Sequence, residues 1–272
     1  MKNLNMILKV RYLTISITII LWSMLFFGST ILAQTNEYSL SGEWYVELVD
    51  SVDQDFRGAR IHRSEGFIHL PGSLAQNRYG VKTIGSDFGI LTPEFKYIGR
   101  ARYTREIEIP LSWKNKEVEI FLERVLWESR IFIDGEKLSR QDALGTPHIH
   151  RIGKLAPGIH QLTIVVNNDM IHNIGDKGHA YSDYTQSIWN GIVGKMEMRS
   201  YDPVHIRSVR TFPDVSADRL KVEVCMNEIP EEKSEFSFSI IPVEGEKIVL
   251  SKKYSLKDFG KDKCVVFDIP VR

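Results

Sequence analysis

From residue 38 onward, the sequence alternates hydrophobic and polar residues in short runs and shows almost no helical period. Successive side chains of a β-strand point to opposite faces of a sheet, so a period of two predicts strands with one buried face. Asp134-Gly135 lies between two runs and predicts a type I′ hairpin turn, which needs positive φ at both residues. Pro110 and Pro157-Gly158 mark further turns. The clearest runs are 102–109, 118–122, 131–133, 161–166 and 196–198.

The strand pattern continues beyond Asp202-Pro203, which we interpret as a domain boundary. An immunoglobulin-like sandwich needs about seven strands, and fewer are visible here, so this second domain is expected to be partial. The chain is therefore predicted to be all-β, with one sandwich at 38–200 and a smaller one at 203–272. The strands expected in the second domain are 205–211, 220–226, 236–241, 248–254 and 265–269.

The segment 168–190 interrupts the pattern, since it is rich in Asn, Asp, His, Gly, Ser and Tyr and has no clear period. More than twenty residues without a period inside a compact domain indicate a functional loop or disorder. Disordered segments contain few aromatic side chains. Tyr181, Tyr184 and Trp189 therefore favour an ordered, functional loop.

The first 33 residues have the features of an export signal. Basic residues precede an apolar run at 13–27, and small and apolar residues follow up to Ala33, before a polar stretch. This order predicts a signal peptide at 1–33, cleaved after Ala33. A retained anchor stays open, because 13–33 is long enough to span a bilayer and Ile31 stands where signal peptides prefer a small residue. Either alternative predicts an exported protein, periplasmic or at the cell surface.

Composition and charge argue against several other classes of protein. The 272 residues include 35 basic and 35 acidic side chains, whereas a nucleic-acid-binding domain usually carries a basic excess. Hydrophobic residues at 43% are sufficient for a folded core. The sequence contains no Gly-x-Ser-x-Gly elbow and no phosphate-binding loop. We therefore expect no nucleic-acid partner and no cofactor.

A series of short motifs follows in order along residues 40–194. They are LSGEW at 40–44, LPGS at 70–73, ARYTR at 101–105, LERV at 122–125, IFIDGE at 131–136, GTPH at 145–148, PGIHQLTIVVN at 157–167 and WNGIVG at 189–194. Each is weak alone, but together they resemble the N-terminal sugar-binding domain of glycoside hydrolase family 2, which includes β-galactosidases, β-glucuronidases and β-mannosidases. Residues from 203 onward resemble the immunoglobulin-like second domain of that family. The resemblance implies a jelly-roll β-sandwich followed by a truncated immunoglobulin-like β-sandwich.

The resemblance also sets an expectation for activity. In this family a (β/α)₈ barrel follows these two domains and carries both catalytic carboxylates. Retaining hydrolysis needs two carboxyl groups about 5 Å apart on either side of the scissile bond. No part of this chain resembles that barrel, so we expect no catalytic residue here and no hydrolysis by the chain alone. Asp134 and Lys195 depart from the Asn and Arg that many members have at these positions.

The same resemblance indicates that the 168–190 segment contacts carbohydrate. Asp183 lies in a stretch that resembles the β-galactosidase loop whose aspartate contacts sugar hydroxyls and helps to hold a sodium ion. A fixed carboxylate is a strong acceptor for hydroxyl donors. Gln186 and Asn190 can both donate to and accept from hydroxyls, and Trp189 can stack on a sugar face. Structural roles stay open for all four: a turn aspartate, amides that satisfy backbone groups and a core tryptophan.

Other clusters of reactive side chains favour structural interpretations. No paired Cys or third convergent ligand accompanies the histidines, so no metal site is expected. Three glutamates lie on the outward face of one alternating strand and are expected to be solvated. The histidines are His148, His150, His160, His172 and His179, the glutamates are Glu117, Glu119 and Glu123, and Trp44 and Trp113 are expected in the core or at strand edges.

The two cysteines, Cys225 and Cys264, are expected to point outward from their strands. Export permits a disulfide without requiring one. Two free thiols are favoured here, because the sequence does not establish that the two strands are neighbours.

Three functions stay open at this point. The chain is expected to be the non-catalytic front part of an exported family 2 glycosidase, shaping its substrate entrance. The alternatives are a free-standing carbohydrate-binding module and a degenerate fragment with an exposed sheet edge that invites aggregation. The expected partner is a glycan or oligosaccharide, and membrane contact is expected only through the signal or anchor. Members of this family often assemble, so a homo-oligomer stays open.

Overall fold

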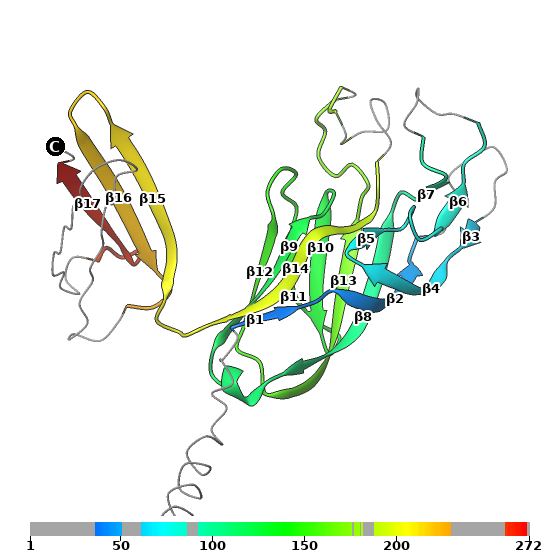
Figure 1. Ribbon diagram of the computed structural model, residues 1–272, viewed down its shortest axis with the longest axis horizontal. Helices are drawn as coiled ribbons and strands as arrows, with labels where there is room; N and C mark the ends of the chain where they lie inside the picture. The colour runs from blue at the N-terminus through cyan, green and yellow to red at the C-terminus, as the bar shows by residue number, and fades with distance from the viewer. Residues whose placement is uncertain are drawn as a thin grey trace, which may run out of the picture. The chain divides into compact units, whose positions relative to one another are not determined.

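The computed structural model describes residues 36–50, 61–85, 92–175, 177–179, 181, 188–229 and 259–270 (Figure 1). The predicted signal or anchor at 1–33 lies outside these residues. Within the described part of the chain, no helix is long and apolar enough to cross a membrane.

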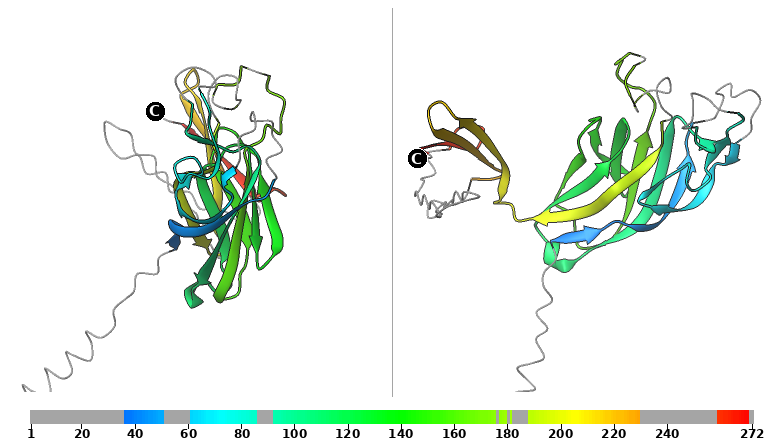
Figure 2. Two further views of the ribbon diagram at one scale, coloured as in Figure 1. Left: turned by 90° about the vertical axis from the view of Figure 1, so that its right-hand side faces the viewer. Right: turned by 45° about the horizontal axis from the view of Figure 1, so that its top comes forward.

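Two antiparallel sheets form a sandwich from residue 36 to residue 201 (Figures 1 and 2). The first sheet has the order β1-β14-β9-β12, with β5 paired to β14, and the second has the order β11-β10-β13-β8-β2-β4. A small sheet, β3-β6-β7, lies outside these two. The prediction of an all-β sandwich is confirmed. The bounds are β1 Glu37–Ser39, β2 Gly42–Leu48, β3 Ile61–Arg63, β4 Glu65–Leu70, β5 Gly72–Ser73, β6 Gly80–Lys82, β7 Phe95–Lys96, β8 Arg100–Ile109, η1 (3₁₀) Leu111–Trp113, β9 Glu117–Arg124, β10 Glu128–Ile133, β11 Glu136–Gln141, β12 His148–Gly153, β13 Gly158–Asn167 and β14 Gly191–Tyr201.

The core between the two sheets follows the alternation in the sequence. β9 and β13 each contain three alternating side chains that are at most 2% exposed, namely Val118, Ile120, Leu122, Leu162, Ile164 and Val166. Burying one such aliphatic side chain stabilises the fold by roughly 1.5–3 kcal/mol. Trp44 and Trp113 were expected in the core or at strand edges, and at 1% exposed each they lie in the core. The Trp44 indole N–H donates to the Leu40 carbonyl at 2.9 Å, so its polar atom is also satisfied.

The predicted hairpin turn joins β10 to β11. Asp134 has φ 51° and Gly135 has φ 83°, the positive values that a type I′ turn requires. Asp134 also connects the turn to β13, because one carboxylate oxygen lies 2.6 Å from Nδ1 of His160 and the other accepts the Gln161 N–H at 2.8 Å. The hydrogen bond with His160 lowers the pKa of Asp134 and raises the pKa of His160.

Beyond residue 203, three strands form an antiparallel sheet in the order β15-β16-β17. They are β15 Ile206–Asp214, β16 Arg219–Met226 and β17 Cys264–Pro270, in agreement with three of the five predicted strands. The alternation predicts seven inward residues in the last two strands. Six of them are buried, namely Val222, Val224, Met226, Val265, Phe267 and Ile269, and the seventh, Leu220, is partly buried and packs against them. The strands predicted at 236–241 and 248–254 lie outside the described residues, so the immunoglobulin-like assignment stays a prediction.

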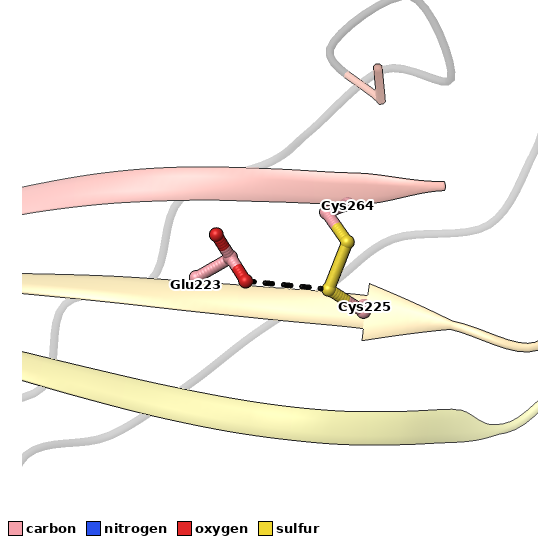
Figure 3. Close-up of side chains that lie close together, drawn as sticks. All are labelled: Glu223, Cys225 and Cys264. Carbon is pink, nitrogen blue, oxygen red and sulfur yellow. Dashed lines mark hydrogen bonds between the residues drawn. A yellow bond between two sulfur atoms is a disulfide. The ribbon is translucent and has the colours of Figure 1, made fainter. Parts of the chain in front are cut away.

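A disulfide joins Cys225 of β16 to Cys264 of β17 (Figure 3). The expectation of two free thiols is wrong, because β16 and β17 are neighbours and place the two cysteines directly opposite each other, with a Cα–Cα distance of 4.0 Å. Both residues are also buried rather than exposed. A carboxylate oxygen of Glu223 lies 3.5 Å from the Cys225 sulfur. A disulfide sulfur carries no proton, so this contact is one of packing.

Candidate functional site

A cleft of about 500 Å³ borders the 168–190 segment, which we call the rim loop. Three parts of the chain that are far apart in sequence line it: the end of β9 with the turn that follows, the connection between β11 and β12, and the rim loop. These parts contain residues of the motifs LERV, GTPH and WNGIVG, so the fold brings three family-like motifs together at one cleft. The lining residues are Glu123, Arg124, Val125, Leu126, Leu144, Gly145, Thr146, Pro147, Tyr181 and Trp189.

Aromatic side chains form one wall of the cleft. The indole N–H of the fully buried Trp127 donates to the Tyr181 carbonyl at 3.1 Å, and the Tyr181 hydroxyl donates to the Leu144 carbonyl at 3.2 Å. Tyr181 is therefore held both at its backbone and at the tip of its ring. Trp189 packs against the same small cluster, whose buried members are Leu126, Trp127 and Ile188.

The charged side chains of Glu123 and Arg124, at the end of β9, line another part of the cleft, and the backbone of β14 holds the Glu123 carboxylate. One carboxylate oxygen of Glu123 accepts the Lys195 backbone N–H at 2.6 Å, and the other lies 3.6 Å from Nε of Arg124. Gly194 makes this approach possible, because its φ is +79° and a Cβ there would lie 2.5 Å from the Glu123 carboxylate. The register between β9 and β14 shifts between Val193 and residue 196, which is the irregularity that brings the backbone N–H to the carboxylate.

Two buried asparagines join the ends of the rim loop. Nδ2 of Asn190 donates to Oδ1 of Asn168 at 3.2 Å and to the Gly99 carbonyl at 2.9 Å. Asn168 accepts the Gly99 N–H and donates to the Tyr97 carbonyl, both at 2.9 Å. The Tyr103 hydroxyl donates to Oδ1 of Asn190 at 2.9 Å, and burial raises the pKa of this hydroxyl, so it stays protonated. These bonds satisfy buried polar groups and fix the base of the loop.

The structure places two of the four predicted sugar-binding residues. Trp189 is half-buried and lines the cleft. Asn190 is 3% exposed and its amide is engaged in the network at the base of the loop. Asp183 and Gln186 lie outside the described residues, in the stretch of sequence between Tyr181 and the end of the loop. Sugar contact by these four residues stays a prediction.

Glu123 and Tyr181 line the cleft, although the sequence did not single them out for this role. The expectation that the β9 glutamates are solvated does not hold for Glu119, whose side chain is 16% exposed and lies 3.7 Å from Arg199 of β14. Burial raises the pKa of Glu119. The side chain of Glu123 is 36% exposed and lies against the backbone of β14. The missing signal was the pairing of β9 with β14, which places Arg199 directly opposite Glu119 on the same face of the sheet.

The two histidines of β12 form a closed hydrogen-bond chain with β10 and β11. His148, His150 and Ser129 are all fully buried. The Ser129 hydroxyl lies 2.6 Å from Nδ1 of His148 and 2.8 Å from Nε2 of His150. The outer ring atoms are also satisfied, Nε2 of His148 by the Ala143 carbonyl at 2.8 Å and Nδ1 of His150 by the Ser139 hydroxyl at 3.0 Å.

One assignment of protons satisfies every bond of this chain. A carbonyl only accepts, so Nε2 of His148 carries its proton and Nδ1 accepts from the Ser129 hydroxyl. The Ser129 oxygen then accepts Nε2–H of His150, and Nδ1 of His150 accepts from the Ser139 hydroxyl. Both rings are neutral in this arrangement. Burial agrees with it, because it lowers the pKa of His148 and lowers the pKa of His150 to about 3.

The described residues include one group of side chains close enough to share a metal ion, Glu223 with Cys225 and Cys264. The disulfide removes both thiolates, which are the ligands that zinc would need there.

Glu123 is the one carboxylate among the described residues that line the cleft. Glycoside hydrolysis needs a pair of carboxyl groups across the scissile bond. The described part of the cleft is therefore equipped to bind through aromatic faces, a carboxylate and a guanidinium.

Comparison with solved structures finds β-glucuronidases. The chain is 19% identical to the Uncultured Clostridium sp. β-glucuronidase, with a TM-score of 0.48, and the match covers 72% of this chain and 34% of that one. For the Faecalibacterium prausnitzii β-glucuronidase the identity is 16%, the TM-score 0.47 and the coverage 71% and 36%. For the Dictyoglomus thermophilum β-D-glucuronidase the values are 14%, 0.45, 70% and 32%. The chain spans about a third of the length of these proteins. No family model and no curated protein sequence matches this chain.

Proposed function

We propose that this chain is the non-catalytic N-terminal portion of an exported glycosidase of the family 2 type, and that its cleft contacts carbohydrate at the substrate entrance. The observation that carries the proposal is the convergence of three motif segments, around residues 123–125, 145–147 and 189, on a single cleft. These segments are far apart in sequence, and a shared ligand explains why motifs of one family meet at one place.

The chemistry of the cleft fits a sugar. Tyr181 and Trp189 offer aromatic faces for the apolar side of a pyranose ring. The Tyr181 hydroxyl already donates to the Leu144 carbonyl and can still accept a hydrogen bond. Glu123 accepts hydrogen bonds from hydroxyls, and Arg124 and Thr146 can donate to ring or hydroxyl oxygens. Asp183 and Gln186 belong to the same loop in sequence and are proposed to complete the contacts.

In this proposal the hydrolytic step belongs to a barrel domain that these residues do not include. Residues 203–272 form the beginning of an immunoglobulin-like domain in the proposal, and the N-terminal segment exports the protein to the periplasm or the cell surface. If the chain acts alone, the same cleft makes it a carbohydrate-binding module. The reading frame that follows this sequence in the genome separates the two, because a glycosidase requires a barrel-coding segment there.

Calorimetric titration of the purified chain with lactose, cellobiose, mannobiose and glucuronic acid tests the cleft. We expect at least one of these sugars to bind, with affinity reduced at least fivefold by Glu123→Gln and by Trp189→Ala. Glu123→Gln keeps an acceptor for the Lys195 N–H, so the fold should be retained. Leu111→Ala is the matched control, because Leu111 is 75% exposed in η1 and does not line the cleft.

Unchanged affinity in both cleft variants would contradict the proposal. Asp183→Ala is expected to leave the fold intact and to weaken the same binding. The purified chain is expected not to hydrolyse aryl glycosides. Reproducible turnover that a single carboxylate substitution abolishes would show that the chain has catalytic residues of its own.

A further inference from the structure

The outer face of the six-stranded sheet carries a band of uncharged side chains that crosses five neighbouring strands. We call it the outer lane and define it by Phe67 (β4), Tyr45 (β2), Thr104 (β8), Thr163 (β13) and Phe132 (β10). Each residue is directly opposite the next in the register of the sheet. Neighbouring strands lie about 4.8 Å apart, so the lane is about 19 Å long from its first strand to its last.

The lane is open to solvent at its aromatic end. Phe67 is 62% exposed and Tyr45 is 40% exposed, and their rings meet edge to face with centroids 5.7 Å apart. The two threonine hydroxyls lie 3.3 Å apart in the middle of the lane and are only partly buried. The neighbouring residues in the same strands point inward and form the core, so the fold does not need the lane side chains for core packing.

Charged and polar side chains line both flanks. Glu65, Glu47 and Arg102 flank the lane on one side. Arg102 pairs with Glu47 at 2.7 Å, and Glu65 accepts a hydrogen bond from the Tyr45 hydroxyl at 3.0 Å. On the other side His69 lies opposite Glu43 in the sheet register. These groups supply hydrogen-bond donors and acceptors along the edges of an apolar strip.

We propose that the outer lane binds an extended neutral oligosaccharide of several sugar units. A pyranose ring has an apolar C–H face and an equator of hydroxyl groups. The aromatic rings match the first, while the threonine hydroxyls, the carboxylates and the guanidinium match the second. A chain of several linked rings fits the length of the lane, whereas a single sugar fills only its aromatic end. This site is separate from the cleft, since none of its residues lines that cleft.

The exposed apolar area argues against a second copy of this chain as the occupant. Two aromatic side chains that are about half exposed offer on the order of 200 Å². A stable protein interface buries about 800 Å² on each partner and has a hydrophobic centre. The lane is narrow and has charged side chains two residues from its axis along the strands, on the same face, which suits a thin, hydroxyl-rich ligand.

The test uses the purified chain and defined hexasaccharides of β-1,4-linked glucose, mannose and xylose, with the corresponding disaccharides. Calorimetry is expected to show that at least one hexasaccharide binds ten or more times more tightly than its disaccharide. Phe67→Ala and Tyr45→Ala should each reduce that affinity at least tenfold. Ile159→Ala is the matched control, because Ile159 is 73% exposed in β13 but lies outside the lane. Both substituted aromatic residues are exposed, so the variants should fold.

Equal hexasaccharide affinity in Phe67→Ala, Tyr45→Ala and the parent would overturn the proposal that the outer lane binds an oligosaccharide. The failure of all three hexasaccharides to bind would overturn it as well. Sedimentation that shows a dimer lost only in Phe67→Ala would replace the oligosaccharide by a second copy. Glu123→Gln distinguishes failure of the outer lane from failure of the cleft. A hexasaccharide affinity that falls in Glu123→Gln but not in Phe67→Ala contradicts binding at the lane alone. An affinity that falls in Phe67→Ala but not in Glu123→Gln contradicts binding at the cleft alone.

Discussion

The buried pair of histidines should make the stability of the first sandwich depend on pH. Burial and the neighbouring His148 lower the pKa of His150 to about 3. In the unfolded chain the same imidazole has a pKa of about 6.5. Between these two values the unfolded state binds a proton that the folded state does not bind, so the free energy of unfolding falls as the pH falls.

The size of the effect follows from the two pKa values. At pH 7.5 both states are neutral at His150, and at pH 5.0 nearly all of the unfolded state is protonated. One pKa unit corresponds to about 1.4 kcal/mol, so lowering the pH from 7.5 to 5.0 costs about 2 kcal/mol through this residue. The lowered pKa of His148 adds to the loss in the same direction.

Urea unfolding monitored by tryptophan fluorescence measures this effect, because Trp44, Trp113 and Trp127 are buried in the folded state. The parent chain and His150→Gln are compared at pH 7.5 and 5.0. Carboxylates titrate in both proteins, so the difference between their pH dependences isolates the imidazole. We expect the parent to lose about 2 kcal/mol more than the variant between the two pH values. His69→Gln, which removes an exposed imidazole, should behave like the parent.

An equal loss in the parent and in His150→Gln would refute the reasoning. It would mean that His150 binds a proton in the folded state, and therefore that the chain of neutral rings through Ser129 is not the arrangement in solution. Near-ultraviolet circular dichroism at pH 7.5 checks that the variant retains its tertiary packing before the comparison is made.

Three further predictions concern stability. Replacing Cys225 and Cys264 by serine should lower the unfolding free energy of the β15-β16-β17 sheet by about 4 kcal/mol, since the bond closes a loop with a sequence separation of 39 residues; urea titration with and without reductant measures it. Tyr103→Phe removes the donor to the base of the rim loop and should cost about 1–3 kcal/mol in urea unfolding, because it leaves a buried amide oxygen without this partner. Gly194→Ala should cost more than about 1 kcal/mol in thermal unfolding, because φ is +79° and the new Cβ would meet the Glu123 carboxylate; a stability equal to the parent's would contradict the contact.

The sequence predicts the sandwich well because alternation is a local property. Burial on one face of a strand needs no knowledge of the partner strand, so the inward residues of β9, β13, β16 and β17 could be assigned from spacing alone. The Asp134-Gly135 turn was predictable for the same reason, since positive φ is a requirement of the two residues themselves.

The features that the sequence did not predict depend on strand pairing. The disulfide requires Cys225 and Cys264 to be opposite each other, and 39 residues separate them. The carboxylate of Glu123 is held by the backbone N–H of Lys195, which requires β14 to lie beside β9. The role of Asn190 at the base of the rim loop depends on Asn168, which lies at the other end of that loop. No local pattern carries such information, because each contact joins segments that only the fold brings together.

The register of the six-stranded sheet determines the core and the outer lane at the same time. A slip of one residue in β2 would move Trp44 to the solvent face and Tyr45 into the core, and Trp44 would lose its buried partners. The core therefore holds the lane residues in line across β4, β2 and β8 without any contribution from a ligand. It follows that Phe67→Ala should change the binding of an oligosaccharide without changing the unfolding free energy by more than about 0.5 kcal/mol. A large loss of stability in that variant would mean that the exposed ring packs against the fold and that the lane is not a preformed surface.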